Sequence, residues 1–344
     1  MPFCGIIIML IYQQDVSFSK NKDVKKENGM IKSKICEILG IRYPVFQGGM
    51  AWVADADLAA AVSEAGGLGI IAGMNMNGEQ LRAEIRKLRE KTQKPFGVNV
   101  MLMSPFTAEV AEVIVEEKVP VVTTGAGNPL PYIKKWIDAG VKVIPVVASV
   151  ALAKMVAKRG ATAVVAEGGE SGGHIGEANT MPLVPQVVDA VDIPVIAAGG
   201  IGDGRGVAAA FMLGAEGVQL GTRFLVAKEC NVHATYKEKV LKAGDTATVV
   251  NGRRVGHPAR ALKNPFTQSF SDIEKDSNST DEELLAFGTG ALRKAVQEGD
   301  WEKGSFLCGQ VAGLVKEEQT CQEILEDLMT GAEALLKNAA ARCE

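Results

Sequence analysis

The chain has 344 residues, of which 47% are hydrophobic, and its formal net charge is −4. It is longer than an average domain, but a single α/β barrel of about 250 residues fits within it. An acidic chain without a long basic run does not indicate a nucleic-acid partner. The six cysteines lack CxxC spacing, and we expect free thiols in a reducing, cytoplasmic compartment.

The first 29 residues differ from the rest of the chain. The apolar run 6–11 is too short to span a bilayer, and its lysines follow the run, unlike those of a signal peptide. Met30 opens the pattern of a folded protein. We therefore expect residues 1–29 to be a disordered or misassigned extension and no segment to enter a membrane. The alternative is a short helix or strand that caps the fold.

From residue 44 onward, short apolar runs alternate with helical patterns. Nearly continuous apolar runs are typical of parallel strands covered on both faces. The expected strands are 45–47, 68–72, 97–101, 119–123, 141–147, 163–166, 195–198 and 217–220. The expected helices are 57–65, 78–91, 107–117, 130–139, 150–159, 184–190 and 204–213. Eight βα units predict an α/β fold of the (β/α)8 TIM-barrel class, and an open doubly wound sheet is the alternative.

The pattern changes after residue 224. Residues 225–275 are polar and basic without a clear period, whereas 281–296 and 319–341 are expected to be helices. We interpret this tail as the eighth barrel helix and a C-terminal helical cap. The expected organisation is an extension at 1–29, a cofactor-binding barrel at 30–230, and a segment 231–344 that completes the same structural unit.

Loops at the carboxyl ends of barrel strands build the active site in this fold. Glycine-rich turns follow the seventh and eighth strands, at 198–200 and 219–222. Glycines let backbone N–H groups approach a phosphate, and helices beginning near Asp203 and after Thr222 would add their positive ends. The alternative is that these glycines only form tight βα turns. There is no Walker motif, and the Gly-x-Gly at 202–204 lacks the context of a dinucleotide site.

Only three histidines are present, and His174 lies on the glycine-rich loop after the sixth strand. Its titration range suits proton transfer near neutral pH, so it is a candidate catalytic residue. The alternative is a structural histidine bonded to a loop carbonyl. For His233 and His257, which lie in the basic tail, we expect surface or loop-packing roles. No close set of histidines and carboxylates predicts a metal site.

The segment 237–263 is basic within an acidic protein. It is interpreted either as a solvated surface or as a docking patch for an acidic partner.

Four stretches of the chain resemble a known family of flavin enzymes. They are 43–55, 123–129, 172–176 and 256–264, and they resemble the nitronate monooxygenase-related flavin barrels, within these most closely the flavin-dependent enoyl-[acyl-carrier-protein] reductases of the FabK type. The resemblance covers residues 31–341. It implies a bound FMN, NADH or NADPH as co-substrate, an acyl carrier protein as partner, and a homodimer.

The resemblance also assigns site residues. It implies that His174 is catalytic. It implies FMN contacts from Gly49, Met50, Ala51, Asn99, Glu167, Gly172, Gly200, Gln219, Leu220, Gly221 and Thr222. Glu167 stands where monooxygenase relatives tend to have glutamine.

The expected activity is reduction of trans-2-enoyl thioesters in fatty acid synthesis. The main alternative is a nitronate monooxygenase, which would oxidise alkyl nitronates with O2. Two further alternatives are a non-catalytic flavin- or phosphate-binding barrel, and a sugar-phosphate isomerase or synthase barrel that would bind no flavin. If the acidic carrier protein is the partner, Arg253, Arg254, Arg260 and Lys263 are the residues expected to dock it.

Overall fold

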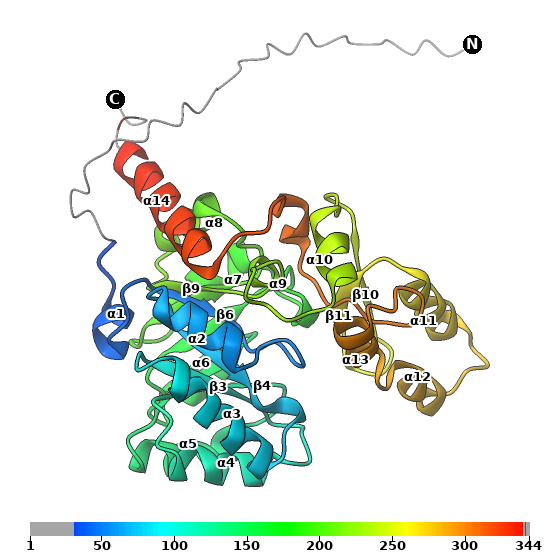
Figure 1. Cartoon of the computed structure of the whole chain (residues 1–344), viewed down its shortest axis with the longest axis horizontal. Helices are drawn as coiled ribbons and strands as arrows, with labels where there is room; N and C mark the ends of the chain where they lie inside the picture. The colour runs from blue at the N-terminus through cyan, green and yellow to red at the C-terminus, as the bar shows by residue number, and fades with distance from the viewer. Residues whose placement is uncertain (1–30, 340, 342–344) are drawn as a thin grey trace. The chain divides into compact units, whose positions relative to one another are not determined.

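Eight parallel strands form the centre of the structure, a computed structural model that describes residues 31–339 and 341 (Figure 1). The strands are β1 (Val45–Gln47), β2 (Gly69–Ala72), β3 (Phe96–Met101), β4 (Val121–Gly125), β5 (Lys142–Val147), β6 (Val164–Glu167), β8 (Val195–Ala198) and β9 (Gly217–Leu220). They are ordered β1-β9-β8-β6-β5-β4-β3-β2. The prediction of eight strands is confirmed, and no strand end is shifted by more than two residues.

The sheet closes on itself between its first and last strands. Phe46 forms a parallel bridge with Leu68, and Gln47 N donates to Leu68 O at 3.0 Å. The buried Gln47 side chain extends this contact, because its Oε1 accepts from Ile70 N at 3.1 Å. The (β/α)8 barrel is therefore confirmed, and the open doubly wound sheet is wrong.

Helices cover the outside of the barrel between consecutive strands. They are α2 (Ala56–Glu64), α3 (Gly78–Lys91), α4 (Thr107–Glu116), α5 (Leu130–Asp138), α6 (Val150–Ala157), α7 (Thr180–Val188) and α8 (Gly204–Met212). The last helix, α14 (Cys321–Ala339), packs against α8 and α2 and so takes the eighth place (Figure 1). Six of the seven helices between strands agree closely with prediction, but α7 begins four residues before its expected start.

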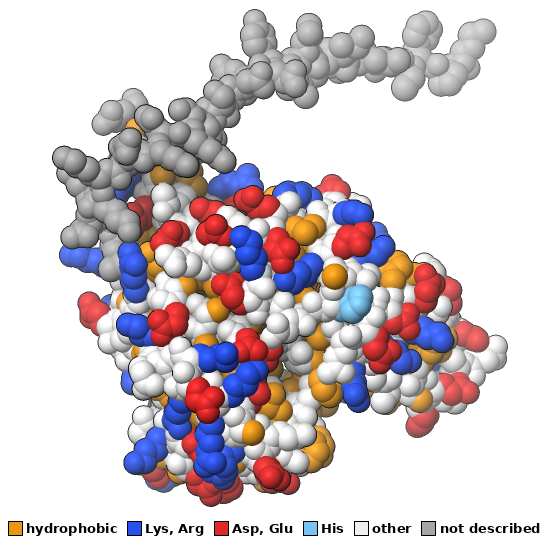
Figure 2. Space-filling view, viewed as in Figure 1, with side chains coloured by type: hydrophobic (Ala, Val, Ile, Leu, Met, Phe, Trp, Pro, Cys, Tyr) orange, Lys and Arg blue, Asp and Glu red, His pale blue; other side chains and the backbone are white. Residues whose placement is uncertain are grey.

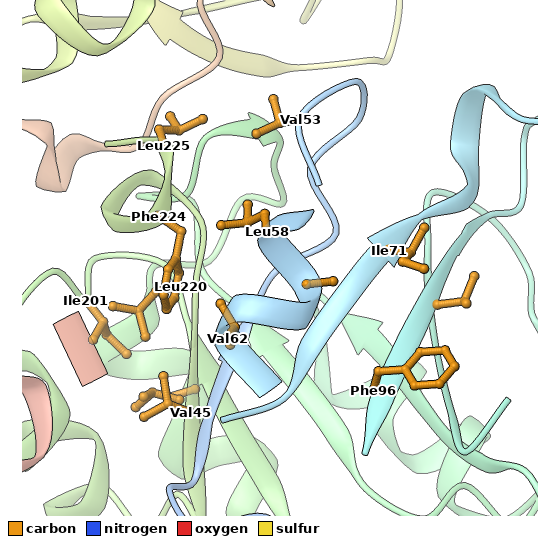
Figure 3. Close-up of a cluster of buried hydrophobic side chains, with 14 of the residues drawn as sticks. Val45, Val53, Leu58, Val62, Ile71, Phe96, Ile201, Leu220, Phe224 and Leu225 are labelled. Carbon is orange, nitrogen blue, oxygen red and sulfur yellow. The ribbon is translucent and has the colours of Figure 1, made fainter. Parts of the chain in front are cut away.

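Side chains alternate between two cores along each strand. Phe46, Ile70 and Ile196 point into the barrel interior, where they are completely buried. Their neighbours, such as Val45 and Ile71, pack outward against the helices, and part of this outer core is drawn in Figure 3. This period-2 pattern explains the continuous apolar runs, because each strand is covered on both faces. The short helix α1 (Lys34–Leu39), which was not predicted, adds Ile35 and Leu39 to the interior core.

The cap is inserted between β9 and α14 and is not purely helical. Its helices are α9 (Thr222–Leu225), α10 (Ala234–Leu241), α11 (Pro265–Lys275), α12 (Asp281–Gly288) and α13 (Ala291–Arg293), followed by a π-helical turn Lys294–Glu298. The strands β10 (Thr248–Asn251) and β11 (Ala259–Leu262) pair with β7 (Gly173–His174) in a second sheet. Residues 225–275, which have no clear period in the sequence, thus contain α10, β10, β11 and α11, and the single helix expected at 281–296 is divided into α12, α13 and the π-helical turn. Short 3-10 helices occur at Gly73–Asn75 and Gln310–Leu314.

The described residues, which include both the barrel and the cap, belong to one compact unit. The expectations for residues 1–29 lie outside the described residues. Within the described part, no helix is long and apolar enough to cross a membrane. The described cysteines Cys36, Cys230, Cys308 and Cys321 are free thiols, as expected.

We predict that Gly69→Ala destabilises the barrel. A Cβ on Gly69 would lie 1.8 Å from Ala59 O, because α2 packs directly on the β2 backbone. Overpacking of this kind costs about 1–3 kcal/mol or more in the free energy of unfolding. Chemical denaturation measures the effect, and Gly244→Ala is the matched control because nothing lies within 4 Å of its added Cβ. Equal stability of the two variants would contradict the packing.

Candidate active site

A cavity of about 480 Å³ opens at the carboxyl ends of the barrel strands. All eight strands contribute lining residues from their carboxyl ends or from the loops that follow them, and residues of the cap, including Tyr236, Leu292 and Leu307, form the remaining wall. All of the predicted site residues lie on this cavity. They are Gly49, Met50, Ala51, Asn99, Glu167, Gly172, His174, Gly200, Gln219, Leu220, Gly221 and Thr222.

The turn after β8 is held in a backbone conformation that favours glycine. Gly199 and Gly200 have φ values of +87° and +70°, and a Cβ on Gly199 would lie 2.8 Å from Gly168 O. The Thr180 hydroxyl donates to Gly199 O at 2.9 Å, and the Glu170 carboxylate accepts from Thr180 N at 2.9 Å. This turn is therefore fixed, with its glycines on the cavity wall.

The turn after β9 leads directly into α9. The Thr222 hydroxyl accepts from Gly309 N at 2.9 Å, so this turn also anchors the cap. No side chain caps α9. At α8, in contrast, Asp203 accepts from Arg205 N at 2.9 Å. The first N–H groups of α9 are therefore not bonded to a capping side chain, whereas those of Arg205 and Gly206 in α8 are bonded to Asp203.

Asn99 is oriented by its neighbouring strand. Its Nδ2 donates to the Thr123 hydroxyl at 2.9 Å, which leaves the amide at the cavity wall. Gly49 passes so close that an added Cβ would lie 2.3 Å from Asn99 Cβ. The backbone at 49–51 and the Asn99 amide are therefore held together on one side of the cavity.

Two titratable groups on the cavity have shifted pKa values. Burial raises the pKa of the Glu167 carboxyl to about 7. The nearby Ser171 hydroxyl acts weakly in the opposite direction, although it lacks a well-formed hydrogen bond in the described structure. The pKa of His174 is lowered, first by desolvation at the cavity wall and then by the charge of His257, although the residue as a whole is exposed at the cavity mouth. Near neutral pH, Glu167 can therefore carry a proton and His174 is neutral.

The structure adds residues to the site that sequence reasoning missed. Glu170 fixes the Gly199 turn. It could have been identified from the sequence, because it lies in the same polar loop as Glu167 and His174. Tyr236 and Leu307 come from the cap and have no local sequence signal, because only tertiary packing brings them to the cavity. No cluster of potential metal ligands occurs among the described residues.

Much of the basic segment is engaged within the protein. Arg260 Nη2 donates to Gly169 O at 2.8 Å, and Arg254 Nε pairs with Asp281 at 2.9 Å. Arg253 forms an ion pair with Glu177 at 2.6 Å, whereas the Lys263 side chain is exposed. On the face shown in Figure 2, basic and acidic side chains are interleaved. Arg254 and Arg260 therefore have structural roles. Lys263 and Arg253 remain as candidate residues for docking an acidic partner.

The barrel, its mouth cavity and the glycine turns define the class of protein. A family model described as nitronate monooxygenase matches residues 32–114 and 104–331. The chain belongs to the nitronate monooxygenase family, which implies a flavin cofactor.

Particular relatives place the chain more narrowly. It is 51% identical to FabK from Thermotoga maritima, with 91% of this chain and 99% of that chain covered and a TM-score of 0.89. The predicted resemblance to the FabK type is thereby confirmed. The chain is also 35% identical to (3aS,4S,5R,7aS)-5-hydroxy-7a-methyl-1-oxo-octahydro-1H-indene-4-carboxyl-CoA dehydrogenase of Mycobacterium tuberculosis, over 91% of this chain and 99% of that protein. A probable nitronate monooxygenase of Staphylococcus aureus is 35% identical, over 81% of this chain and 91% of the relative.

We predict that Glu167→Gln changes the pH dependence of stability. A folded-state pKa of about 7, raised from 4.5, gives stability that is fully present below pH 4.5 and is lost as the pH rises through 7. The melting temperature of the unsubstituted protein should therefore fall relative to that of Glu167→Gln between pH 4.5 and pH 8. Exposed Glu90→Gln is the control and should show no such trend. If the melting temperatures of the original protein and of Glu167→Gln change with pH in the same way, a raised pKa of Glu167 is excluded.

Proposed function

We propose that this chain is an FMN-dependent enoyl-[acyl-carrier-protein] reductase that uses NADH or NADPH to reduce trans-2-enoyl thioesters in fatty acid synthesis. The observation that carries the proposal is the 51% identity to FabK along nearly the full length of both chains. A second relative is named for a reaction on a carboxyl-CoA, which is also a thioester. The cavity with His174 on its wall supplies a site for this chemistry.

The cavity residues fit an FMN. The glycine turns at Gly200 and Gly221 leave room for a phosphate near backbone N–H groups. Ser171 Oγ is buried, lines the cavity and has no partner in the described structure, so a bound polar group can satisfy it. The backbone at 49–51, Asn99 and Glu167 would face the ring system, and Gly172, Gln219, Leu220 and Thr222 would complete the contacts. When bound, FMN supplies hydride transfer from the nicotinamide to the β-carbon of the enoyl group.

In this proposal, His174 stabilises charge on the substrate. Hydride addition at the β-carbon of an enoyl thioester moves negative charge onto the thioester oxygen, and a proton from solvent then reaches the α-carbon to give the saturated thioester. A neutral imidazole can donate an N–H hydrogen bond to that oxygen, and the lowered pKa means that His174 is not basic enough to be protonated at neutral pH. Because its pKa is lowered, His174 is better suited to donate a hydrogen bond to the thioester oxygen than to carry a second ring proton.

The cavity also offers an apolar surface for the acyl chain. Met74, Met101, Leu152 and Leu292 share the cavity with the polar residues, and Leu292 belongs to the cap. An acyl chain gains free energy from apolar contact, whereas a short alkyl nitronate would leave much of this surface unused. This composition supports a thioester with an acyl chain as the substrate.

A nitronate monooxygenase is the second candidate, favoured by the family model and by the relative from Staphylococcus aureus. It would use the same cavity and His174 but would require O2 and no nicotinamide. The proposal of a reductase further includes an acyl carrier protein as partner, a homodimer and a cytoplasmic location, which all rest on the resemblance to the FabK type.

We predict that His174→Ala retains flavin but loses most enoyl reduction. Loss of a donor to the developing oxyanion lowers kcat by about 100-fold or more. Flavin absorbance of the purified protein and turnover of crotonyl-CoA measure the two properties. His233→Ala is the control, because His233 lies outside the cavity and accepts from Thr235 N at 3.1 Å in its own helix cap. Near-normal turnover in His174→Ala would rule out the proposed role.

We also predict that Lys263→Glu weakens the reaction with carrier-bound substrate. An acidic carrier is attracted by exposed basic side chains, so charge reversal should raise KM for the carrier thioester several-fold and leave KM for the CoA thioester unchanged. Lys158→Glu is the matched control, since Lys158 is an exposed lysine after α6, remote in the sequence from the cap. An equal change for both substrates would count against docking at Lys263.

A further inference from the structure

A second histidine, His257 of the cap, lies beside His174. In the second sheet, His174 of β7 lies opposite Ala259 of β11, and Ile175 N donates to Pro258 O at 3.0 Å. The imidazoles of His174 and His257 are 6.4 Å apart between centroids and stand at 89° to each other. Residues separated by more than eighty positions in the sequence thus form an edge-to-face pair.

The backbone of His257 is fixed by a tight turn. His257 N donates to Gly252 O at 2.9 Å. Gly252 has a φ of +83°, and a Cβ there would lie 2.5 Å from His257 O. The turn therefore requires glycine at 252. His174 lines the cavity and His257 does not, so His257 can influence a bound substrate only through His174.

Charged side chains on the neighbouring elements have partners of their own. On β11, Arg260 donates to Gly169 O, and on the loop after β6, Glu170 accepts from Thr180. Arg253 and Glu177 form their own ion pair at 2.6 Å. Positive charge on His257 lowers the pKa of His174, after the larger effect of desolvation, because like charges this close repel each other.

We propose that His257 is a positioning residue, which holds the His174 imidazole edge-on at the cavity wall. Edge-to-face contact restricts rotation of the His174 ring, because aromatic pairs prefer this geometry over others. Charge on His257 opposes charge on His174, which preserves the neutral N–H donor as the pH falls. The inference rests on the role proposed above for His174.

Two substitutions separate the two effects of His257. His257→Phe keeps an aromatic ring in contact with His174 but removes the titratable group, whereas His257→Ala removes both. The chain has only three histidines, so their imidazole NMR signals can be assigned by single substitution in the flavin-loaded protein, and His233 serves as an internal reference. The pKa of His174 should rise in both variants, while that of His233 stays constant. An unchanged pKa of His174 in both variants would overturn the proposal.

Kinetics with crotonyl-CoA provide the second readout. In His257→Phe, kcat at its optimum should stay within about threefold of the original value, with the acidic limb moved to higher pH. In His257→Ala, kcat should fall about tenfold at constant KM, since the ring contact is also lost. Equal kcat values in the original protein and both variants would refute positioning. If the original protein reduces no enoyl thioester, the proposed function fails, and the NMR titration still decides whether His257 controls His174.

Discussion

The pairing of β7 with β11 is the contact on which the site depends. It is only two residues long on the barrel side, yet it joins the loop after β6 to the cap and places His174 on the cavity wall. The cap in turn supplies Tyr236 and Leu307, so the cavity is complete only when both parts are folded together. Arg260 strengthens the same junction through Gly169 O. Catalysis and the attachment of the cap are thus coupled by one small sheet.

The polar residues around the cavity divide into groups that hold the backbone and groups free to meet a ligand. Glu170 and Thr180 lock the Gly199 turn, and Thr222 anchors Gly309 of the cap. Glu167 and His174, in contrast, present titratable groups whose pKa values are shifted in opposite directions, chiefly by burial. Both shifts favour the neutral form. A neutral carboxylic acid and a neutral imidazole can donate hydrogen bonds without adding a charge to the site. Hydride transfer to an enoyl thioester requires such donors.

The barrel could be predicted because its strands are covered on both faces, so runs such as 195–198 appear as uninterrupted apolar segments. The start of α7 was predicted too late, because Pro182 and Pro185 lie within it and weaken the local helical pattern. The strands β10 and β11 gave no local signal, since they form only against β7 and each other. For the same reason, His174 was identified from its loop, whereas the pairing of His257 with His174 was missed, although His257 is an exposed loop residue as expected. The flavin was predicted from the family resemblance, because the glycine turns alone would suit any ligand that carries a phosphate.

The most direct test of the proposed reductase is an anaerobic flavin titration of the purified, flavin-loaded protein. NADH or NADPH is added until the flavin absorbance is lost, and crotonyl thioester is then mixed in without oxygen. For a reductase, we expect the nicotinamide to bleach the flavin rapidly. The enoyl thioester should then restore the flavin absorbance rapidly and be converted to the saturated thioester. A flavin that resists the nicotinamide but turns over an alkyl nitronate with O2 would contradict this expectation and identify a nitronate monooxygenase.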